Sequence, residues 1–301
     1  MLPRVTWFAS PDDVGTRLRA LGYLPDAATS TTAFLAGELE KPLLIEGPAG
    51  VGKTQLAKVV AAAAGAELVR LQCYEGLDEA RALYEWNYRK QLLRIQASGS
   101  DQAWSETHDD IFTDEFLLTR PLLTAIRRSG PTVLLIDEVD KTDVEVEGLL
   151  LEVLSDFQVT IPELGTLTAV RRPYVVLTSN ATRELSEAVK RRCLYLHIDY
   201  PDAEREREIL LSHLPDLEMA LTGQVVAVIA ELRQLELKKS PSIAETIDWA
   251  RTLVALQIET LDLEAVSRTL GAVLKHASDH DKALRELAKP ALRQRLPTAG
   301  Q

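Results

Sequence analysis

The sequence predicts a doubly wound α/β domain built on a five-stranded parallel sheet and followed by a small all-α domain. Five short runs are mostly continuous in apolar residues instead of alternating, as expected for parallel strands covered on both faces. Helical stretches lie between these runs, and this βαβ order is typical of an open parallel sheet. After about residue 200 the strand-like runs end and apolar residues recur at helical spacing. The expected strands are 43–45, 68–71, 133–136, 174–178 and 194–198.

We therefore expect an α/β domain over residues 1–199 and a helical domain over residues 200–301. In the helical domain, Asp262 is suited to cap the helix that follows it. Three groups of apolar residues each share one helical face. The groups are Val225, Ile229 and Leu232; Ile243, Ile247, Ala250 and Val254; and Leu263, Val266, Leu270 and Val273.

The composition indicates a globular protein with an acidic surface. Of the 301 residues 46% are hydrophobic, enough for a proper core, and the formal charge is −11. This charge argues against general binding of nucleic acid through the protein surface. A local basic channel inside a ring is still a possible interpretation. The N-terminus lacks a basic-then-apolar signal, and no apolar run reaches the ~18 residues of a membrane span. We expect a cytoplasmic protein without membrane contact.

Cys73 and Cys193 are the only cysteines. Their spacing suggests neither a zinc site nor a disulfide framework. We expect reduced thiols that are inert in apolar surroundings.

Residues 47–54 (GPAGVGKT) fit the phosphate-loop pattern GxxxxGK[ST] without a mismatch. The setting is also right, because a short apolar run precedes the octet and a helical run, residues 55–61, follows it. The sequence therefore predicts a site for ATP. The residues expected to bind the nucleotide are Gly47, Pro48, Ala49, Gly50, Val51, Gly52, Lys53 and Thr54.

Each part of this octet has a physical role. The three glycines let the backbone curl so that successive N–H groups point inward, and the following helix adds partial positive charge. Lys53 is expected to reach the β- and γ-phosphates, and the Thr54 hydroxyl to hold Mg²⁺.

Polar residues follow two of the other predicted strands. Asp137 is expected to bind Mg²⁺ through water, and Glu138 to polarise the attacking water. Asn180 is expected to hydrogen-bond the γ-phosphate or position that water. Taken alone, the acids suit a helix cap and the amide suits a turn. Because ligands bind beyond the carboxyl ends of parallel strands, their arrangement behind a phosphate loop favours a hydrolytic site.

Three cations, Lys190, Arg191 and Arg192, end a helical stretch just before the last predicted strand. One interpretation is that they offset the helix dipole. The other is that they reach across a subunit boundary to a neighbour's γ-phosphate, as an arginine finger does. These residues alone leave both interpretations open.

In this order, and with a helical domain after them, the motifs resemble those of an AAA+ ATPase. They are the phosphate loop, IDE at 136–138, TSN at 178–180 and RRC at 191–193. Within that superfamily the chain resembles the MoxR-type group, and most closely the CoxD-like accessory ATPases of carbon monoxide dehydrogenase maturation. The segments that carry the narrower resemblance are 71–93, 116–126, 149–169 and 241–253.

The resemblance implies roles that spacing does not show. It makes Arg192 the favoured arginine finger and Asn180 the sensor-1 residue. It makes residues 158–169 a pre-sensor hairpin, and the residues after Tyr74 a helix-2 insertion that faces the centre of a ring.

Such proteins assemble as hexamers and often work with a partner that carries a von Willebrand A-type domain. The resemblance thus implies a ring-forming ATP hydrolase that acts as a chaperone or remodelling factor, with a molybdenum- or copper-type metalloenzyme as its client. The alternative is an ATP-dependent switch or scaffold with slow hydrolysis. A nucleic-acid motor is disfavoured by the charge. A GTPase is disfavoured because residues 140–143 (DKTD) lack the Asn-Lys-x-Asp arrangement that reads guanine.

The sequence departs from the family at sensor 2. Ala244 stands where many MoxR-type proteins have an arginine in a PSPRA-like element. Arg251, seven residues later on the same helical face, either replaces that arginine or forms a surface salt bridge. The second interpretation is favoured.

Two further groups each have a functional and a structural interpretation, and the structural one is favoured in both. Tyr74, Tyr84, Trp86 and Tyr88 either grip a substrate in a pore or pack in a core or interface. The pair His276 and His280 either binds a metal or belongs to a solvated helix face.

Overall fold

The structure, a computed structural model, describes residues 6–98 and 110–289. The chain forms two compact units. The α/β unit runs as far as His197 without residues 48–52, and the helical unit begins at Ile198 and includes residues 48–52. Among the helices that the described residues form, none has the length and apolar character needed to cross a membrane.

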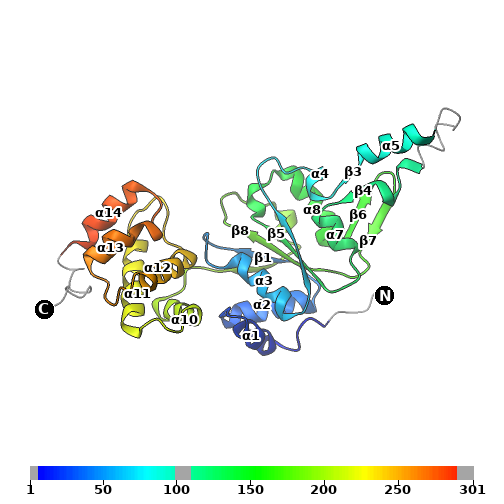
Figure 1. The fold of residues 1–301 in the computed structure, drawn as a ribbon. Coiled ribbons are helices and arrows are strands. Elements are labelled where there is room, and N and C mark those ends of the chain that lie inside the picture. Colours follow the sequence, from blue (N-terminus) through cyan, green and yellow to red (C-terminus); the bar gives the residue numbers. More distant parts are fainter. Residues whose placement is uncertain (1–5, 99–109, 290–301) are drawn as a thin grey trace. The chain divides into compact units, whose positions relative to one another are not determined.

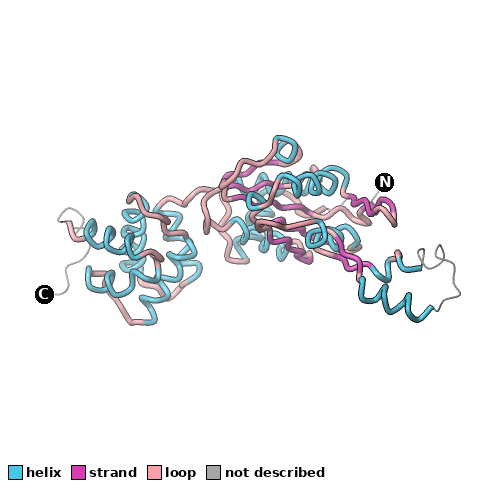
Figure 2. The backbone as a smooth tube through the Cα atoms, turned by 90° about the horizontal axis from the view of Figure 1, so that it is seen from above, coloured by secondary structure: helices cyan, strands magenta, loops and turns pink. Residues whose placement is uncertain are grey.

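The α/β unit is built on a five-stranded, all-parallel sheet with helices on both faces (Figures 1 and 2). The strand order is β2-β5-β8-β1-β9. The predicted fold class is confirmed, and all five predicted runs are strands of this sheet. Their bounds are β1 (Leu43–Glu46), β2 (Glu67–Gln72), β5 (Thr132–Asp137), β8 (Tyr174–Ser179) and β9 (Leu194–His197).

Helices and short strands fill the connections between these strands. Some helices begin where a side chain caps the first turn: Ser10 and Asp26 each accept a hydrogen bond from a backbone N–H three residues later. Two antiparallel pairs lie outside the main sheet, β3 with β4 and β6 with β7. The second pair is a hairpin within the predicted residues 158–169. The bounds are α1 (Pro11–Ala20), α2 (Ala27–Glu38), α3 (Lys53–Ala63), α4 (Glu79–Ala82), β3 (Tyr84–Trp86), α5 (Tyr88–Ser98), η1 (Asp114–Phe116), β4 (Leu117–Thr119), α7 (Pro121–Arg127), η2 (Val139–Lys141), α8 (Val144–Asp156), β6 (Gln158–Ile161), β7 (Gly165–Thr168) and α9 (Glu187–Lys190).

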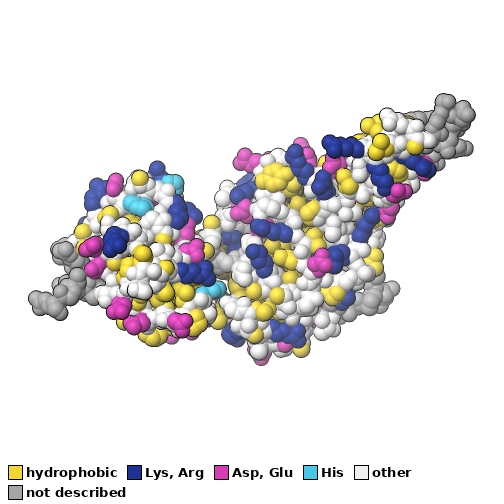
Figure 3. All heavy atoms as spheres, in the orientation of Figure 1, with side chains coloured by type: hydrophobic (Ala, Val, Ile, Leu, Met, Phe, Trp, Pro, Cys, Tyr) yellow, Lys and Arg dark blue, Asp and Glu magenta, His cyan; other side chains and the backbone are white. Residues whose placement is uncertain are grey.

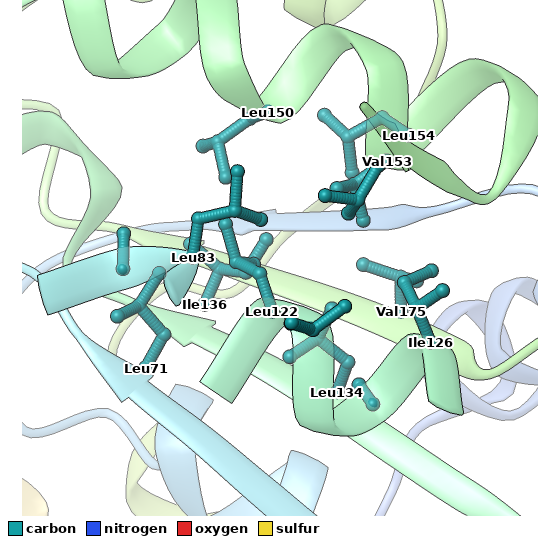
Figure 4. Close-up of a cluster of buried hydrophobic side chains, with 14 of the residues drawn as sticks. Leu71, Leu83, Leu122, Ile126, Leu134, Ile136, Leu150, Val153, Leu154 and Val175 are labelled. Carbon is teal, nitrogen blue, oxygen red and sulfur yellow. The ribbon is translucent and has the colours of Figure 1, made fainter. Parts of the chain in front are cut away.

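The interior strand β5 is buried along its whole length because helices cover both faces of the sheet. Leu134 and Ile136 belong to a hydrophobic cluster with α7 and α8, and Figure 4 shows them below Leu150 of α8. Val133 and Leu135 alternate with them and therefore point to the opposite face, where α3 packs. This two-sided burial explains why the run is continuously apolar.

The predicted aromatic group divides into packed and exposed residues. Trp86 is buried, and its ring meets that of Tyr84 edge-on with 6.2 Å between centroids. Tyr74 and Tyr88 are exposed. Figure 3 shows hydrophobic and basic side chains together on the described part of α5. Packing therefore accounts for Tyr84 and Trp86 but not for the other two.

The helical unit contains no strand among its described residues, as predicted for the chain after residue 200. Ser242 begins α12 with a capping box, in which its side chain and that of Glu245 each accept a backbone hydrogen bond from the other residue. The helices are α10 (Ala203–His213), α11 (Met219–Gln234), α12 (Ile243–Ala255), α13 (Leu263–Thr269), η3 (Leu270–Ala272) and α14 (Ala277–Leu287).

Two of the three predicted apolar faces are confirmed. The core of this unit contains the predicted residues of α11 and the whole third group, with Leu263 only partly buried. The predicted face of α12 is only partly correct, because Ala250 is buried and Ile247 packs against this core, whereas Val254 is exposed and Trp249 is fully buried instead. The Trp249 indole donates a hydrogen bond of 2.8 Å to Thr269 Oγ1, so the largest side chain of α12 decides which face packs inward. Asp262 caps α13 as predicted, accepting a backbone hydrogen bond of 2.7 Å.

A buried ion pair joins three parts of the helical unit. Arg233 of α11 makes a bidentate pair with Glu206 of α10, with N–O distances of 2.7 and 2.8 Å. The Arg233 Nε also donates to the Pro241 carbonyl at 2.9 Å, just before α12, and the guanidinium lies 4.6 Å from the Tyr200 ring centroid. Thr246 of α12 donates to Glu206 at 3.0 Å. The start of α12 is therefore tied to α10 and α11 through one arginine.

We predict that Arg233→Ala lowers the local free energy of unfolding of α10 and α12 by about 3–5 kcal/mol, because Glu206 would remain buried without its cation. Hydrogen exchange of peptides from these helices measures this loss. Arg251→Ala is the matched control, since Arg251 is exposed and pairs with the exposed Asp248 at 3.4 Å; its effect should stay within about 0.5 kcal/mol. A loss below about 1 kcal/mol for Arg233→Ala would mean that water replaces the guanidinium.

Candidate active site

The predicted polar residues meet at the carboxyl edge of the parallel sheet. Strand β8 lies between β5 and β1, so the residues after these three strands are brought to one edge. Thr54 Oγ1 donates to Asp137 Oδ1 at 2.9 Å, and Lys53 Nζ donates to Asn180 Oδ1 at 2.8 Å. Asn180 Nδ2 in turn lies 3.4 Å from Glu138 Oε1. The structure thus brings together all five of these residues.

The Asp137 carboxylate is only 1% exposed and is surrounded by donors. Besides Thr54, the Thr178 hydroxyl of β8 donates to Oδ1, and Arg70 Nε of β2 donates to Oδ2 at 3.0 Å. A carboxylate buried this deeply is stable only with such partners. Three neighbouring elements therefore fix the orientation of Asp137.

Glu138 is more accessible, with a side chain that is 33% exposed. Its backbone has φ 56° and ψ 48°, a left-handed conformation that is rare for a residue other than glycine. The Thr178 hydroxyl accepts a hydrogen bond of 2.9 Å from the Glu138 N–H in this conformation. The carboxylate accepts hydrogen bonds from Gln72 Nε2 at 2.9 Å and Lys141 Nζ at 2.7 Å. Glu138 makes no side-chain cap to the turn that follows, so the cap interpretation does not apply to it.

Lys53 is 6% exposed and is directed into the site by acceptors. Its Nζ donates to the Gly47 carbonyl at 2.7 Å as well as to Asn180. Burial lowers the pKa of Lys53 below its usual value, and attraction by nearby carboxylates, Asp140 first, opposes this effect. The preceding loop has positive φ at Gly50 (77°) and Gly52 (98°), where a side chain would strain the backbone.

The sequence analysis missed Arg70 and Gln72 of β2. Strand β2 pairs with β5 in parallel, and Gln72 lies opposite Asp137 in the register. Arg70 and Gln72 also hydrogen-bond each other, so they connect Asp137 to Glu138. Their signal in the sequence is the alternation of polar residues with the buried Val69 and Leu71, which marks one face of an otherwise apolar strand.

A family model described as AAA domain (dynein-related subfamily) matches residues 42–193, half of the chain. The chain belongs to this AAA family. The match contains the phosphate loop and the site residues Arg70, Gln72, Asp137, Glu138 and Asn180, and membership implies a nucleotide-binding site.

Relatives of this AAA protein share about a quarter of their residues with it. An uncharacterised protein of Staphylococcus haemolyticus is 26% identical over 77% of this chain and 84% of its own length. The gas vesicle ATPase GvpN of Haloferax mediterranei is 26% identical over 65% of this chain and 58% of its own length. Among solved structures, a mutant of Thermotoga maritima RuvB has 17% identity and a TM-score of 0.49, covering 90% of this chain and 73% of that one.

The three cations before β9 make their contacts outside this site. Arg192 donates from Nη1 to the Ala188 carbonyl at 2.9 Å and from Nε to the Ser155 hydroxyl of α8. Lys190 pairs with a nearby glutamate at 2.8 Å, whereas Arg191 is almost fully exposed. The hydrogen bonds of Arg192 in the described part of the chain are thus with α8 and α9, not with the residues around Lys53.

Arg251 and His280 have structural partners within the helical unit. Arg251 is exposed and pairs with Asp248, as the favoured interpretation predicts. A ring nitrogen of His280 lies 2.9 Å from the Leu274 carbonyl, and no group of three or more possible metal ligands occurs among the described residues. On the same helix as His280, Asp279 is buried and accepts the Lys238 N–H, so the expected solvated face does not include this residue.

Both thiols have raised pKa values. Burial is the main cause that raises the pKa of Cys73 to about 12, and the charge of Asp137, whose carbonyl accepts the Cys73 N–H, adds to it. Burial also raises the pKa of Cys193 to about 12, although Arg192 opposes the shift. A raised pKa leaves little thiolate at neutral pH, which is the form that reacts.

We predict that both thiols react slowly with iodoacetamide at pH 8, where about 10⁻⁴ of each is thiolate if the pKa is about 12. Mass spectrometry of native and urea-unfolded protein compares the two rates. The Cys73→Ala, Cys193→Ala double variant should keep ATPase activity within a few-fold. Fast alkylation of the native protein, or loss of activity in a folded double variant, would contradict an inert role.

Proposed function

We propose that this AAA protein hydrolyses the β–γ bond of ATP with Mg²⁺, at the site formed by Lys53, Thr54, Asp137, Glu138 and Asn180. The observation that carries the proposal is the hydrogen-bonded chain from Lys53 through Asn180 to Glu138. It supports the proposal because a cation, an amide and an accessible carboxylate lie close enough together to act on one substrate. The relative named gas vesicle ATPase supports the same activity.

The oxygen atoms at the site suit Mg²⁺. Thr54 Oγ1 and Asp137 Oδ1 lie 2.9 Å apart, and hydroxyl and carboxylate oxygens are the ligands that this ion prefers. These two residues would hold the ion directly or through water, and the bound ion would offset negative charge on the phosphates.

In this mechanism each side chain has a separate task. Lys53 offsets the charge on the phosphate groups, Asn180 orients the γ-phosphate or the attacking water, and Glu138 accepts a proton from that water. Gln72 and Lys141 hold the Glu138 carboxylate in place. The ion pair between Glu138 and Lys141 is partly exposed and weak, so water can replace Lys141 at the carboxylate.

We further propose that the protein is a MoxR-type, CoxD-like member that works as a hexameric ring. In such a ring Arg192 reaches the ATP of the neighbouring subunit, and the client is a metalloenzyme of the molybdenum or copper type, recruited with a von Willebrand A-type partner. The support is the ordered set of motifs and the position of Arg192 outside its own subunit's phosphate site. A pull-down with Glu138→Gln tests the client and the partner.

An ATP-dependent switch with slow hydrolysis is the second candidate. The observation that favours it is the 2.7 Å ion pair between Glu138 and Lys141, which competes with water for the carboxylate. Stimulation of hydrolysis by a client would separate a remodelling ATPase from such a switch.

We predict that Lys53→Ala abolishes ATP binding, because the phosphates lose their buried cation. Isothermal titration calorimetry measures the binding. Lys58→Ala is the matched control, since Lys58 lies on the same helix and is exposed. Normal affinity of Lys53→Ala would place the nucleotide elsewhere.

We predict that Glu138→Gln binds ATP normally but loses most of its hydrolysis, since only the proton acceptor is removed. Phosphate release beside calorimetry tests this. Glu145→Gln, an exposed glutamate on α8, should behave like the parent protein. If Glu138→Gln hydrolyses ATP at the parent rate, another residue accepts the proton from the attacking water.

We predict that Arg192→Ala binds ATP but hydrolyses it roughly 10³–10⁵-fold more slowly, the range known for arginine fingers. Mixing it with Glu138→Gln should restore part of the activity, because some interfaces then combine an intact Glu138 with a neighbour's intact Arg192. If subunits are shown to exchange and the mixture is no more active than either variant alone, Arg192 is not the arginine finger. Arg191 would then be tested next.

A further inference from the structure

Two acids that follow Glu138 in the chain are buried, and the mechanism above does not use them. Asp140 is 3% exposed and Glu147 is 1% exposed. Burying a carboxylate costs free energy unless partners compensate for the lost water. The partners of both acids lie in one segment, residues 180–186, which connects Asn180 to the helix that precedes Arg192.

Asp140 holds the beginning of this segment. Its Oδ2 accepts hydrogen bonds from the N–H groups of Asn180 at 3.2 Å and Thr182 at 3.0 Å, and from the Thr182 hydroxyl at 2.6 Å. Ala181 between them has φ 56°, a turn that these bonds stabilise. Burial alone would raise the pKa of Asp140, but the bonds from Thr182 and Asn180 outweigh it and hold the pKa low. The backbone that carries the Asn180 amide is therefore anchored on a charged group.

Glu147 holds the end of the same segment. Its Oε2 accepts the Ser186 N–H at 2.9 Å, and its Oε1 pairs with Arg183 at 2.6 Å. Ser186 is the N-cap of α9, accepting the Val189 N–H. At the other end of α9, Arg192 donates to Ser155, which like Glu147 belongs to α8. Helix α8 therefore supports both ends of the element that presents Arg192.

We propose that Asp140 and Glu147 are positioning residues for ATP hydrolysis that serve two different active sites. Asp140 fixes Asn180 at the site of its own subunit. Glu147 fixes α9, and with it Arg192, for the site of the neighbouring subunit. The inference rests on the proposed function, including the arginine finger.

A purely structural role makes a different prediction. If the two acids only stabilised the fold, their loss would reduce activity in proportion to the folded fraction and without regard to the neighbouring subunit. If the acids are positioning residues, Asp140 variants should lose hydrolysis at the active site of their own subunit. Glu147 variants should instead reduce hydrolysis at the active site of the neighbouring subunit. The two roles therefore differ in which inactive partner restores activity.

The single variants are Asp140→Asn and Glu147→Gln, which keep the shape and remove the charge. Each should bind ATP within about three-fold of the parent and lose roughly 10- to 100-fold in kcat, since small displacements of catalytic groups have effects of this size. Calorimetry and phosphate release give the two values. Glu145→Gln on α8 is the matched control and should leave both unchanged. A parent kcat in either variant would overturn the assignment for that acid.

Mixtures of inactive variants then separate the two acids. Asp140→Asn mixed with Arg192→Ala should restore activity, because the Asp140→Asn subunit supplies an intact Arg192 to the intact active site of the Arg192→Ala subunit. Asp140→Asn mixed with Glu138→Gln should stay inactive, because both subunits then have a defective active site. Glu147→Gln should show the reverse, restoring activity with Glu138→Gln and not with Arg192→Ala. The same partner preference for both variants would overturn the proposal.

The mixture of Arg192→Ala with Glu138→Gln tells this inference apart from the proposed function. If that mixture is active but the Glu147→Gln mixture is not, only the role of Glu147 fails. If it stays inactive while subunits exchange, the finger fails and the role of Glu147 fails with it, whereas Asp140 is still decided by its kcat at unchanged ATP affinity. Should Glu147→Gln not fold, Arg183→Gln removes the same ion pair from its more exposed side and should give the same pairing.

Discussion

The buried carboxylate of Asp137 joins the elements on which the rest of the site depends. It accepts hydrogen bonds from Thr54 of α3, Thr178 of β8 and Arg70 of β2, while its own strand β5 lies between β2 and β8 in the sheet. An anion with 1% exposure is stable only while donors surround it, so moving any of the three elements would remove a hydrogen bond from a buried charge. The position of Glu138 and the distance from α3 to the sheet edge follow from this constraint.

Much of the fold and of the site could be predicted from the sequence, because both depend on chemistry close to strand ends. Asp137 and Asn180 lie at the ends of apolar runs, and Lys53 follows the loop that begins where another run ends; parallel strands bring such ends together. Arg70 and Gln72 could not be placed in this way. Their role depends on β2 lying beside β5, and the order of strands in the chain does not give their order in the sheet. The face of α12 was likewise decided by tertiary packing.

The partners of Glu138 are compatible with both proposed functions, a remodelling ATPase and a switch with slow hydrolysis. Its left-handed backbone directs the carboxylate to Gln72 and Lys141, whose donors occupy one oxygen, while the other lies near Asn180. The pair with Lys141 is partly exposed, and exposed pairs contribute about 0–1 kcal/mol. Such a contact restrains the carboxylate without trapping it. A bound client that displaces Lys141 would therefore free an acceptor for water at little cost.

Four acids in the stretch from Asp137 to Glu147 differ in exposure in a way that matches their proposed roles. Asp137, Asp140 and Glu147 are 1–3% exposed, and fixed donors from other elements orient each of them. Glu138 alone among these four has a side chain that water reaches, with 33% exposure. A general base must exchange a proton with water, and a positioning carboxylate must not exchange its partners. The difference in exposure supports the proposed role of Glu138 as the proton acceptor, and it supports the proposed positioning roles of Asp140 and Glu147.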